Sequence, residues 1–254
     1  MPEAPEVINL ADNLNNKLIG QKLLSIERVG GRYSTEKNRK APSGWDEFVV
    51  NLKLEKVKSK GKFLYFTFED TDLTIWFTFG LKGYIKEGSK NKVIEFTFEK
   101  NTYYFTDTMG YGTVKFSNSK KELKDKLSGL GPDVINDTIC KNIFMKKKVL
   151  GKNIVDVLTN QKIISGIGNY LVAEIMYEAK INPDKNVEDL DDDKLNDLIK
   201  AIENVSRTSY LAGGSKNYGG NYICKVYMQE KDPLNNIVHK TKRKGGRTTH
   251  HVNF

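Results

Sequence analysis

The spacing of apolar residues separates a β-rich first part of the chain from a helical second part. In residues 5–19 apolar side chains recur every three or four positions, with Asn and Asp between them, which predicts an amphipathic helix starting at Pro5. From about residue 22 to 116 the pattern changes to short runs rich in aromatic and β-branched residues. We expect strands at 23–29, 48–54, 63–68, 73–79, 93–98, 103–105 and 112–116. Gly, Asn, Asp and Lys separate these runs, which favours a β-sandwich.

After Ser117 the spacing becomes helical again. The predicted helical segments lie around 123–130, 154–158, 170–179 and 195–210, with breaks at Gly131-Pro132 and Asn182-Pro183. The tail returns to short β-like runs at 222–228, 236–239 and 248–252. The pattern therefore predicts an α+β protein of two domains. These are an N-terminal β-sandwich with a leading helix (1–119) and a helical domain (120–220) that carries a β-hairpin appendage (221–254).

The charge of the chain narrows the class of partner. Lysine and arginine outnumber aspartate and glutamate by 41 to 32, a formal net charge of +9. This surplus favours polyanions, nucleic acid first, although many basic proteins bind none. Cys140 and Cys224 are too few for a disulfide scaffold or a four-thiolate zinc site. Without a secretion signal or a run of about 18 apolar residues, we expect a soluble, intracellular protein of nucleus or cytoplasm, with a virus-encoded origin left open.

The first residues offer a chemical site. Removal of Met1 ahead of the small Pro2 would leave a secondary amine, which at a pKa of about 8 is partly neutral and nucleophilic. Such an amine attacks an aldehyde-like carbon to give an iminium ion, an electron sink that permits β-elimination. Glu3 or Glu6 could move the protons if burial raised the pKa of the carboxyl group. The alternative is plain helix initiation, because Pro5 and acids suit a first helical turn.

The stretch Pro2-Glu3-Ala4-Pro5-Glu6-Val7 resembles the N-terminus of the formamidopyrimidine-DNA glycosylase and endonuclease VIII (Fpg/Nei) family, and five further segments match in the same order. The resemblance implies a nucleophilic Pro2 and a catalytic Glu3, with Glu6 as support. In Ser59-Lys60-Gly61-Lys62-Phe63-Leu64, Lys62 matches the family's essential lysine, which contacts DNA phosphate at the lesion. Lys60 is a second DNA-binding candidate. Alone, each lysine would suit a solvated turn.

Two segments match loops that enter the DNA stack in this family. Leu81, in Gly80-Leu81-Lys82-Gly83, matches the apolar residue that fills the hole left by a flipped nucleotide. In the segment 106–112, Tyr111 matches an aromatic wedge, and Met109 joins it as a void-filling candidate. The family commonly has arginines where this chain has Met109 and Gly110. We therefore expect weak discrimination of the opposite base and relatively good activity on single strands.

A helix-two-turn-helix of the same family is indicated from Leu130-Gly131-Pro132-Asp133 onward. It leads through Gly166-Ile167-Gly168-Asn169 into a predicted helix. The glycines would let the backbone approach a phosphate, and Asn169 would donate hydrogen bonds to it, so Gly168 and Asn169 are predicted to bind DNA. Glu174 falls on an acidic position that the resemblance links to the active site. An ordinary acid on a helix surface is the alternative.

The tail resembles the C-terminal finger of the family. In members with zinc, four cysteines flank the hairpin, whereas the matching positions here are Leu234, Ile237, Val252 and a site beyond Phe254. We therefore predict a zincless finger held by packing, with no metal and no cofactor. A second metal-ligand set, drawn from Cys224 and the histidines 239, 250 and 251, fits no zinc spacing well. Arg247 matches the finger arginine that grips phosphates around the lesion, although the basic run 240–247 also suits a solvated tip.

These residues together predict a monomeric DNA glycosylase with strand-nicking lyase activity, acting on damaged single- or double-stranded DNA. The resemblance implies that Pro2 forms a Schiff base and that β,δ-elimination follows. Oxidised pyrimidines and formamidopyrimidines are the expected substrates, because residues 211–222 are short for a loop that caps 8-oxoguanine. Two alternatives stay open: a non-catalytic damaged-DNA-binding protein on the same scaffold, and an unrelated basic enzyme or ribosome-associated protein that shares the short motifs.

Overall fold

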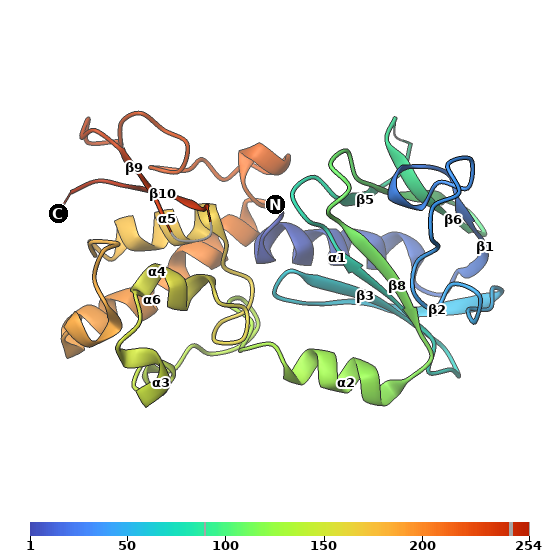
Figure 1. The fold of residues 1–254 in the computed structure, drawn as a ribbon, viewed down its shortest axis with the longest axis horizontal. Coiled ribbons are helices and arrows are strands. Elements are labelled where there is room, and N and C mark those ends of the chain that lie inside the picture. Colours follow the sequence, from blue (N-terminus) through green and yellow to red (C-terminus); the bar gives the residue numbers. More distant parts are fainter. Residues whose placement is uncertain (89, 244–245, 254) are drawn as a thin grey trace. The chain divides into compact units, whose positions relative to one another are not determined.

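The computed structural model describes residues 1–88, 90–243 and 246–253. Its backbone contacts group the chain into two compact units (Figure 1). The first unit comprises Met1–Pro2 with Val7–Ser128, and the second comprises Glu3–Glu6 with Gly129–Phe254. No helix in the described ranges is long and apolar enough to cross a membrane.

The first unit is built on an eight-stranded antiparallel sheet with the strand order β5-β7-β6-β1-β2-β3-β4-β8. Its strands are β1 (Lys22–Arg28), β2 (Leu52–Lys60), β3 (Phe63–Phe68), β4 (Thr74–Thr78), β5 (Tyr84–Lys86), β6 (Lys92–Phe98), β7 (Thr102–Thr106) and β8 (Thr113–Ser117). Only two residue pairs join β1 to β2. Aromatic rings from the two halves meet in the core, where Phe77 lies 5.6 Å from Phe96 and 6.0 Å from Phe105 between ring centroids. The predicted sandwich is confirmed.

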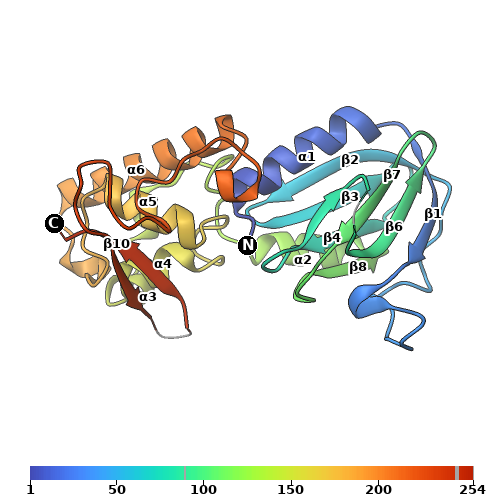
Figure 2. The ribbon, with the colours of Figure 1, turned by 90° about the horizontal axis from the view of Figure 1, so that it is seen from above.

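Helix α1 (Ala4–Leu18) lies along this sheet, as Figure 2 shows. Leu10, Leu14 and Leu18 are buried in the same core as the strands. On β2, the backbone N–H of Val57 donates to the side-chain oxygen of Asn15 at 2.7 Å, and the Asn15 amide donates to the Val57 carbonyl at 2.8 Å. This reciprocal pair fixes the helix on the sheet.

One strand prediction in this unit was wrong, and one strand was not predicted. The run 48–54 is not a strand over most of its length, because Asn51 adopts a positive φ of 65° and β2 begins only at Leu52. Only two of the nine residues of β2, Leu54 and Val57, are buried, and lysines and a glutamate fill most of the other positions, so no apolar run indicated that the strand extends to Lys60. β5 was missed because it has three residues. The 3₁₀ turn η1 (Gly31–Tyr33) follows β1.

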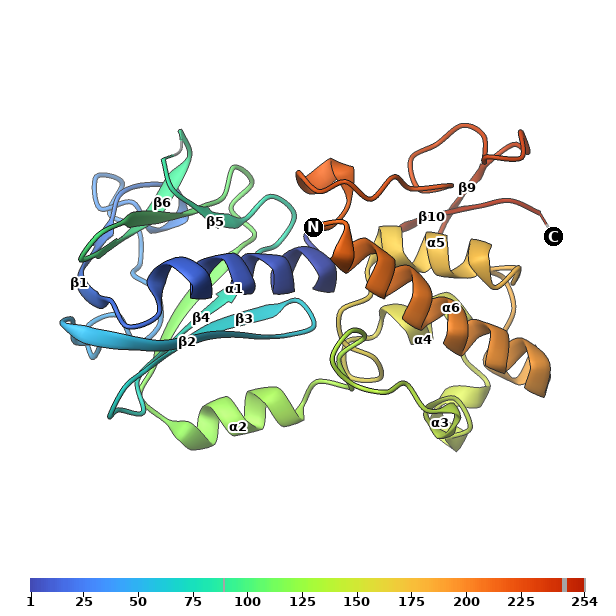
Figure 3. The same cartoon turned by 180° about the vertical axis from the view of Figure 1, so that it is seen from behind.

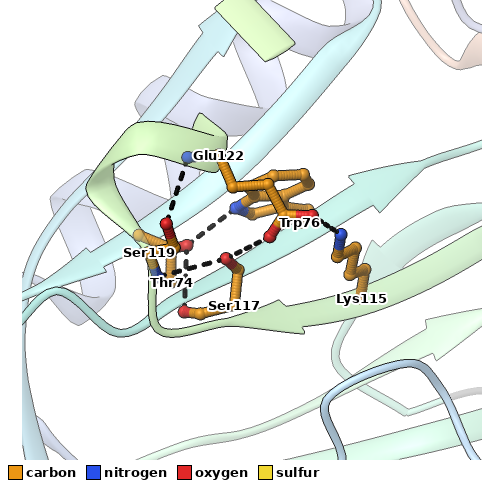
Figure 4. A network of polar contacts seen from close by, with 6 residues as sticks. All are labelled: Thr74, Trp76, Lys115, Ser117, Ser119 and Glu122. Atoms are coloured by element: carbon orange, nitrogen blue, oxygen red, sulfur yellow. Dashed lines mark hydrogen bonds and ion pairs between the residues drawn. The ribbon is translucent and has the colours of Figure 1, made fainter. Parts of the chain in front are cut away.

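Helix α2 (Lys120–Ser128) buries none of its residues but is tied to the sheet at both ends. At its start, the hydroxyl oxygen of Ser119 accepts the N–H of Glu122, and the Glu122 carboxylate accepts Ser117 Oγ and the Lys115 ammonium (Figure 4). At its end, Lys60 Nζ donates to the Leu127 carbonyl at 3.1 Å. These contacts group α2 with the first unit, whereas we predicted a domain boundary between residues 119 and 120.

The second unit is helical. Its α-helices are α3 (Lys147–Leu150), α4 (Ile154–Thr159), α5 (Asn169–Glu178) and α6 (Asp192–Leu211), with 3₁₀ turns η2 (Lys141–Ile143), η3 (Val187–Asp189) and η4 (Lys216–Tyr218). α5 packs on α6 around a buried apolar core (Figure 3). The strands β9 (His239–Lys242) and β10 (Thr248–His251) form a hairpin, and β10 contacts α5. The expected strand at 222–228 is wrong, because its backbone N–H groups bind a side chain instead, as described below.

Candidate functional site

Pro2 is buried at the start of the chain, and Met1 before it is exposed. With Met1 attached, the nitrogen of Pro2 belongs to a tertiary amide, which has no N–H and no nucleophilic lone pair. The predicted amine chemistry at Pro2 therefore depends on removal of Met1.

The Glu3 carboxylate caps the N-terminus of α5. Glu3 is 2% exposed. It accepts the backbone N–H groups of Gly168 at 2.6 Å, Tyr170 at 3.0 Å and Leu171 at 3.2 Å. Three amides at a helix N-terminus stabilise the ionised form of the Glu3 carboxylate and fix its position. The arrangement also engages the N–H of Gly168, one of the glycines at which we expected the backbone to approach a DNA phosphate.

Glu6 lies in a buried polar network. One carboxylate oxygen accepts the Ser215 N–H at 2.7 Å and the Tyr170 hydroxyl at 2.9 Å, and the other accepts the Glu3 N–H at 2.8 Å. Tyr170 Oη also lies 3.1 Å from Ser209 Oγ. Burial raises the pKa of Glu6, although the hydrogen bonds oppose this shift, and burial also raises the pKa of Tyr170. The network fixes the position of the Glu6 carboxyl group, and its predicted role in proton transfer stays a prediction.

The turns between α4 and α5 are organised by one side chain. Gln161 donates to the carbonyls of Thr159 and Ile167, both at 2.9 Å, and accepts the Gly166 N–H at 2.9 Å. Gly131 packs directly against this segment, where a Cβ would lie 2.4 Å from the Ile163 carbonyl oxygen. This close approach explains why the Gly131-Pro132 motif and the later turn occur together, and it supports a helix-two-turn-helix.

Asn169 is the first residue of α5 and is half-buried. No hydrogen bond to its side-chain amide is formed by the residues that the structure describes. Because Gly168, Tyr170 and Leu171 already donate to Glu3, Asn169, through its backbone N–H or its side-chain amide, is the residue of this helix end that we expect to donate to a phosphate. The predicted roles of Gly168 and Asn169 in DNA binding stay predictions.

Glu174 is not an ordinary surface acid. It is 1% exposed on α5. Its carboxylate accepts the backbone N–H groups of Lys225 at 2.7 Å, Val226 at 2.9 Å and Tyr227 at 2.8 Å. Burial raises the pKa of Glu174, and these three hydrogen bonds act against the rise. The carboxylate thus anchors the segment that leads into the hairpin, and it takes up the N–H groups that a strand would have used.

The two lysine candidates differ in their surroundings. Lys60 and Lys62 are both half-buried, at the end of β2 and in the two-residue turn before β3. Lys60 is engaged with the carbonyl of Leu127 at the end of α2. This contact gives Lys60 a structural role in the first unit. The DNA contacts predicted for both lysines stay predictions.

The void-filling candidates lie on two adjacent loops of the first unit. Leu81, Met109 and Tyr111 are 46%, 48% and 61% exposed. A Cβ on Gly80 would lie 2.7 Å from the Cβ of Tyr111, so the backbones of the two loops touch. Exposed apolar side chains gathered in this way suit insertion between bases.

The hairpin of the second unit is held by packing, but only partly by the residues we expected. Val252 is buried with Val226 and Val238 against Ala173 of α5. Leu234 and Ile237 are 76% and 65% exposed, so the packing expected of them is wrong. Phe254 and the site beyond it lie outside the described residues.

Arg247 is exposed beside β10, and its carbonyl accepts the N–H of Arg243 at 2.8 Å. Arg243 in turn forms an ion pair with Asp184 at 2.8 Å. Within the described ranges, no group of three or more His, Cys, Asp or Glu residues could hold a metal ion. The Arg247 side chain is thus presented on a hairpin whose base is anchored, as phosphate binding would require.

Several residues of this site were missed by sequence reasoning. Gln161 binds the Gly166 N–H, Tyr170 binds the Glu6 carboxylate, and Asp107 and Arg32 bind the loop that carries Met109 and Tyr111. Gln161 and Tyr170 flank the segment Gly166-Ile167-Gly168-Asn169, but nothing in their spacing indicated a hydrogen-bonding role. Arg32 lies about 80 residues from its partners, a separation that no local pattern reveals.

A β-sandwich, a helix-two-turn-helix and a hairpin define the class of helix-two-turn-helix glycosylase folds. Residues 1–114 match the N-terminal domain of formamidopyrimidine-DNA glycosylase, and residues 130–217 match its H2TH domain. The formamidopyrimidine-DNA glycosylase of Rickettsia bellii is 31% identical over 229 residues, which cover 85% of this chain and 80% of the relative. That of Listeria innocua is 29% identical and covers 95% and 88%. The chain belongs to the formamidopyrimidine-DNA glycosylase family.

Solved structures agree with this fold. Lactococcus lactis formamidopyrimidine-DNA glycosylase, non-covalently bound to DNA containing an abasic (AP) site, has a TM-score of 0.84 at 23% identity, with 98% of this chain and 97% of the other covered. The same enzyme in complex with FAPY-dG-containing DNA has a TM-score of 0.85, with 98% of each chain covered. The predicted α+β fold and family are confirmed.

Proposed function

We propose that this protein is a bifunctional DNA glycosylase and AP lyase that excises oxidised bases through a Schiff base on Pro2. The observation that carries the proposal is the fixed position of Glu3 next to Pro2, with the Glu3 carboxylate bound by three amides of α5. Family membership supports the glycosylase activity. The lyase activity and the substrate range are inferred from the chemistry of the N-terminus.

The proposed reaction begins when the Pro2 amine, freed of Met1, attacks C1′ of the damaged nucleotide. The bond between C1′ and the base breaks, and the base leaves with a proton. As the bond between C1′ and O4′ breaks, O4′ takes up the proton that the attacking amine gave to Glu3, and the nitrogen lone pair completes an iminium ion, C1′=N⁺. Loss of a proton from C2′ expels the 3′ phosphate, and a second elimination expels the 5′ phosphate. Water then hydrolyses the iminium ion and releases the amine.

Glu3 is proposed to take the proton that the Pro2 amine loses on attack. The three α5 amides favour its ionised form, which is the form that a base requires. Glu6 has a pKa raised by burial and supports the same end of the chain through its bond to the Glu3 N–H. Glu3, as an ionised carboxylate, can accept a proton, and Glu6, whose pKa is raised, can donate one. The two groups together permit proton transfer in either direction.

DNA is the proposed partner, and each unit contributes contacts to it. The net charge of +9 favours association with the backbone. We assign phosphate contacts to Lys62, Asn169 and Arg247, and wedge contacts to Leu81 and Tyr111. Exposure of Arg247 and of the apolar wedge side chains supports these assignments. Lys60 is a weaker candidate because of its bond to the carbonyl at the end of α2.

Oxidised pyrimidines and formamidopyrimidines are the proposed substrates. Between α6 and Tyr222 the chain closes on itself, since the Asn221 N–H donates to the Ala212 carbonyl at 2.7 Å and the Tyr222 N–H donates to the Gly214 carbonyl at 2.9 Å. This compact turn leaves no long loop in the segment 211–222 to cap 8-oxoguanine, so we expect 8-oxoguanine to be released more slowly than the other two lesion classes.

The test is a panel of labelled oligonucleotides that carry an oxidised pyrimidine, a formamidopyrimidine, 8-oxoguanine or an abasic site. We expect base release and a one-nucleotide gap, with faster release of the first two lesions than of 8-oxoguanine. A matched enzyme that keeps one extra N-terminal residue should bind the same DNA without releasing the base. Binding by both enzymes without any base release would contradict the proposal and indicate a damaged-DNA-binding protein.

A further inference from the structure

The loop from Asp107 to Gly112, which carries Met109 and Tyr111, is fixed from within at its base. The Asp107 carboxylate accepts the N–H of Gly112 at 2.6 Å and of Met109 at 3.0 Å. At the tip the situation differs. Gly110 has a φ of +72°, and a Cβ there would meet nothing within 4 Å. A contact from outside the loop would add a restraint at the tip to the one that Asp107 imposes at the base.

Arg32 supplies that contact. Its Nη1 donates to the carbonyl of Gly112 at 2.9 Å and to the carbonyl of Gly110 at 3.2 Å. One planar guanidinium group thus joins the base of the loop to its tip. A guanidinium group suits this task because its N–H groups are fixed in direction.

Arg32 is itself held in place by its neighbours. It lies in η1, where the guanidinium carbon is 5.3 Å from the centre of the Tyr33 ring. The Tyr33 hydroxyl donates to the Val114 carbonyl at 3.3 Å and accepts the Val114 N–H at 3.2 Å. Val114 belongs to β8, which directly follows the loop. Arg32 and the loop are therefore attached to the same strand.

We propose that Arg32 is the positioning residue of the loop 107–112, here called the wedge loop, and that it determines how well the enzyme acts on duplex DNA relative to single-stranded DNA. The inference rests on the proposed function. A wedge is needed only where a flipped nucleotide leaves a hole in a base stack, as in a duplex. Without the two hydrogen bonds from Arg32, the loop would still permit chemistry on a single strand, but Met109 and Tyr111 would lose their defined positions.

The loop has no cation of its own, because the sequence between Asp107 and Gly112 contains neither lysine nor arginine. Arg32 brings one guanidinium group to the loop from a segment about 80 residues away.

The experiment compares base release from one lesion placed in duplex and in single-stranded DNA. Arg32→Met should lower the duplex rate about tenfold, as expected for a lost hydrogen bond to a charged group, and leave the single-strand rate within about twofold. Arg32→Lys keeps the charge but not the planar pair of donors, so it should restore little. Hydrogen exchange of the amides at 109–112 should speed up in both variants.

Arg28→Met is the matched control. Arg28 is the last residue of β1 and precedes η1, which contains Arg32. Its Nη1 donates to the Arg39 carbonyl at 3.2 Å, and it has no hydrogen bond to the loop among the described residues. It should leave the ratio of the two rates unchanged, and all variants should unfold within a few degrees of wild type. An unchanged ratio in Arg32→Met, or a wild-type ratio in Arg32→Lys, would overturn the inference. A wild-type enzyme that releases no base from either DNA would instead refute the proposed function.

Discussion

Loss of the Glu174 carboxylate should detach the segment 222–228 from α5. Three backbone N–H groups donate to this buried carboxylate. Each hydrogen bond to a charged group contributes about 1.5–3 kcal/mol, so the sum is roughly 4–9 kcal/mol if the segment stays in place. If the segment detaches from α5, its N–H groups can bind water instead, so the loss of unfolding free energy is smaller than this sum. We therefore expect Glu174→Ala to lower the free energy of unfolding by about 3–5 kcal/mol, as for other broken buried charge clusters.

Amide hydrogen exchange measures this effect directly. In Glu174→Ala the amides of Lys225, Val226 and Tyr227 should exchange at least about 100-fold faster than in wild type. Glu174→Gln should be intermediate, because its oxygen can still accept two N–H groups while its NH₂ opposes the third. Glu178→Gln is the matched control: it is one turn along α5, exposed, and loses only an ion pair with Lys225 Nζ. Unchanged protection of the three amides in Glu174→Ala would refute the anchoring role.

Two further outcomes are expected. Burial raises the pKa of Glu6 above 4.5, so its contribution to stability is complete below pH 4.5 and is lost as pH rises through the raised pKa. Denaturation curves should therefore show the free energy of unfolding of wild type, minus that of Glu6→Gln, falling over this range; a constant difference would contradict the shift. Arg247→Gln should weaken binding to all DNA sequences alike and reduce the slope of log affinity against log salt by about 1. An unchanged slope in a fluorescence-anisotropy titration would remove Arg247 from the phosphate contacts.

The fold followed from sequence where burial and periodicity agree. α1 and α6 bury one face at helical spacing, and β3 and β4 are apolar runs, so their patterns indicated the right elements. β2 was misplaced because only two of its nine residues, Leu54 and Val57, are buried, which leaves no apolar run to indicate the strand. The segment 222–228 has strand composition, yet its N–H groups bind Glu174 rather than a neighbouring strand. Local composition does not report such long-range hydrogen bonding.

The sequence named candidate site residues but did not indicate how they are arranged in space. The motif residues Glu3, Gly168 and Tyr170 were all within recognised segments, but the sequence did not indicate that Glu3 caps α5. Glu3 lies 165 positions before Gly168 and 167 positions before Tyr170. A motif can identify such residues, whereas their pairing depends on tertiary packing. The same holds for Arg32 and its loop.

The most direct test of the account is reductive trapping on Pro2. Enzyme whose N-terminus is shown by mass spectrometry to begin at Pro2 is mixed with lesion DNA and borohydride, which reduces an iminium ion to a stable amine. We predict a covalent protein-DNA adduct that peptide mapping places on the Pro2 nitrogen, and no adduct with enzyme that retains Met1. An adduct on a lysine, or none with DNA from which the enzyme has released the base, would contradict the proposed mechanism.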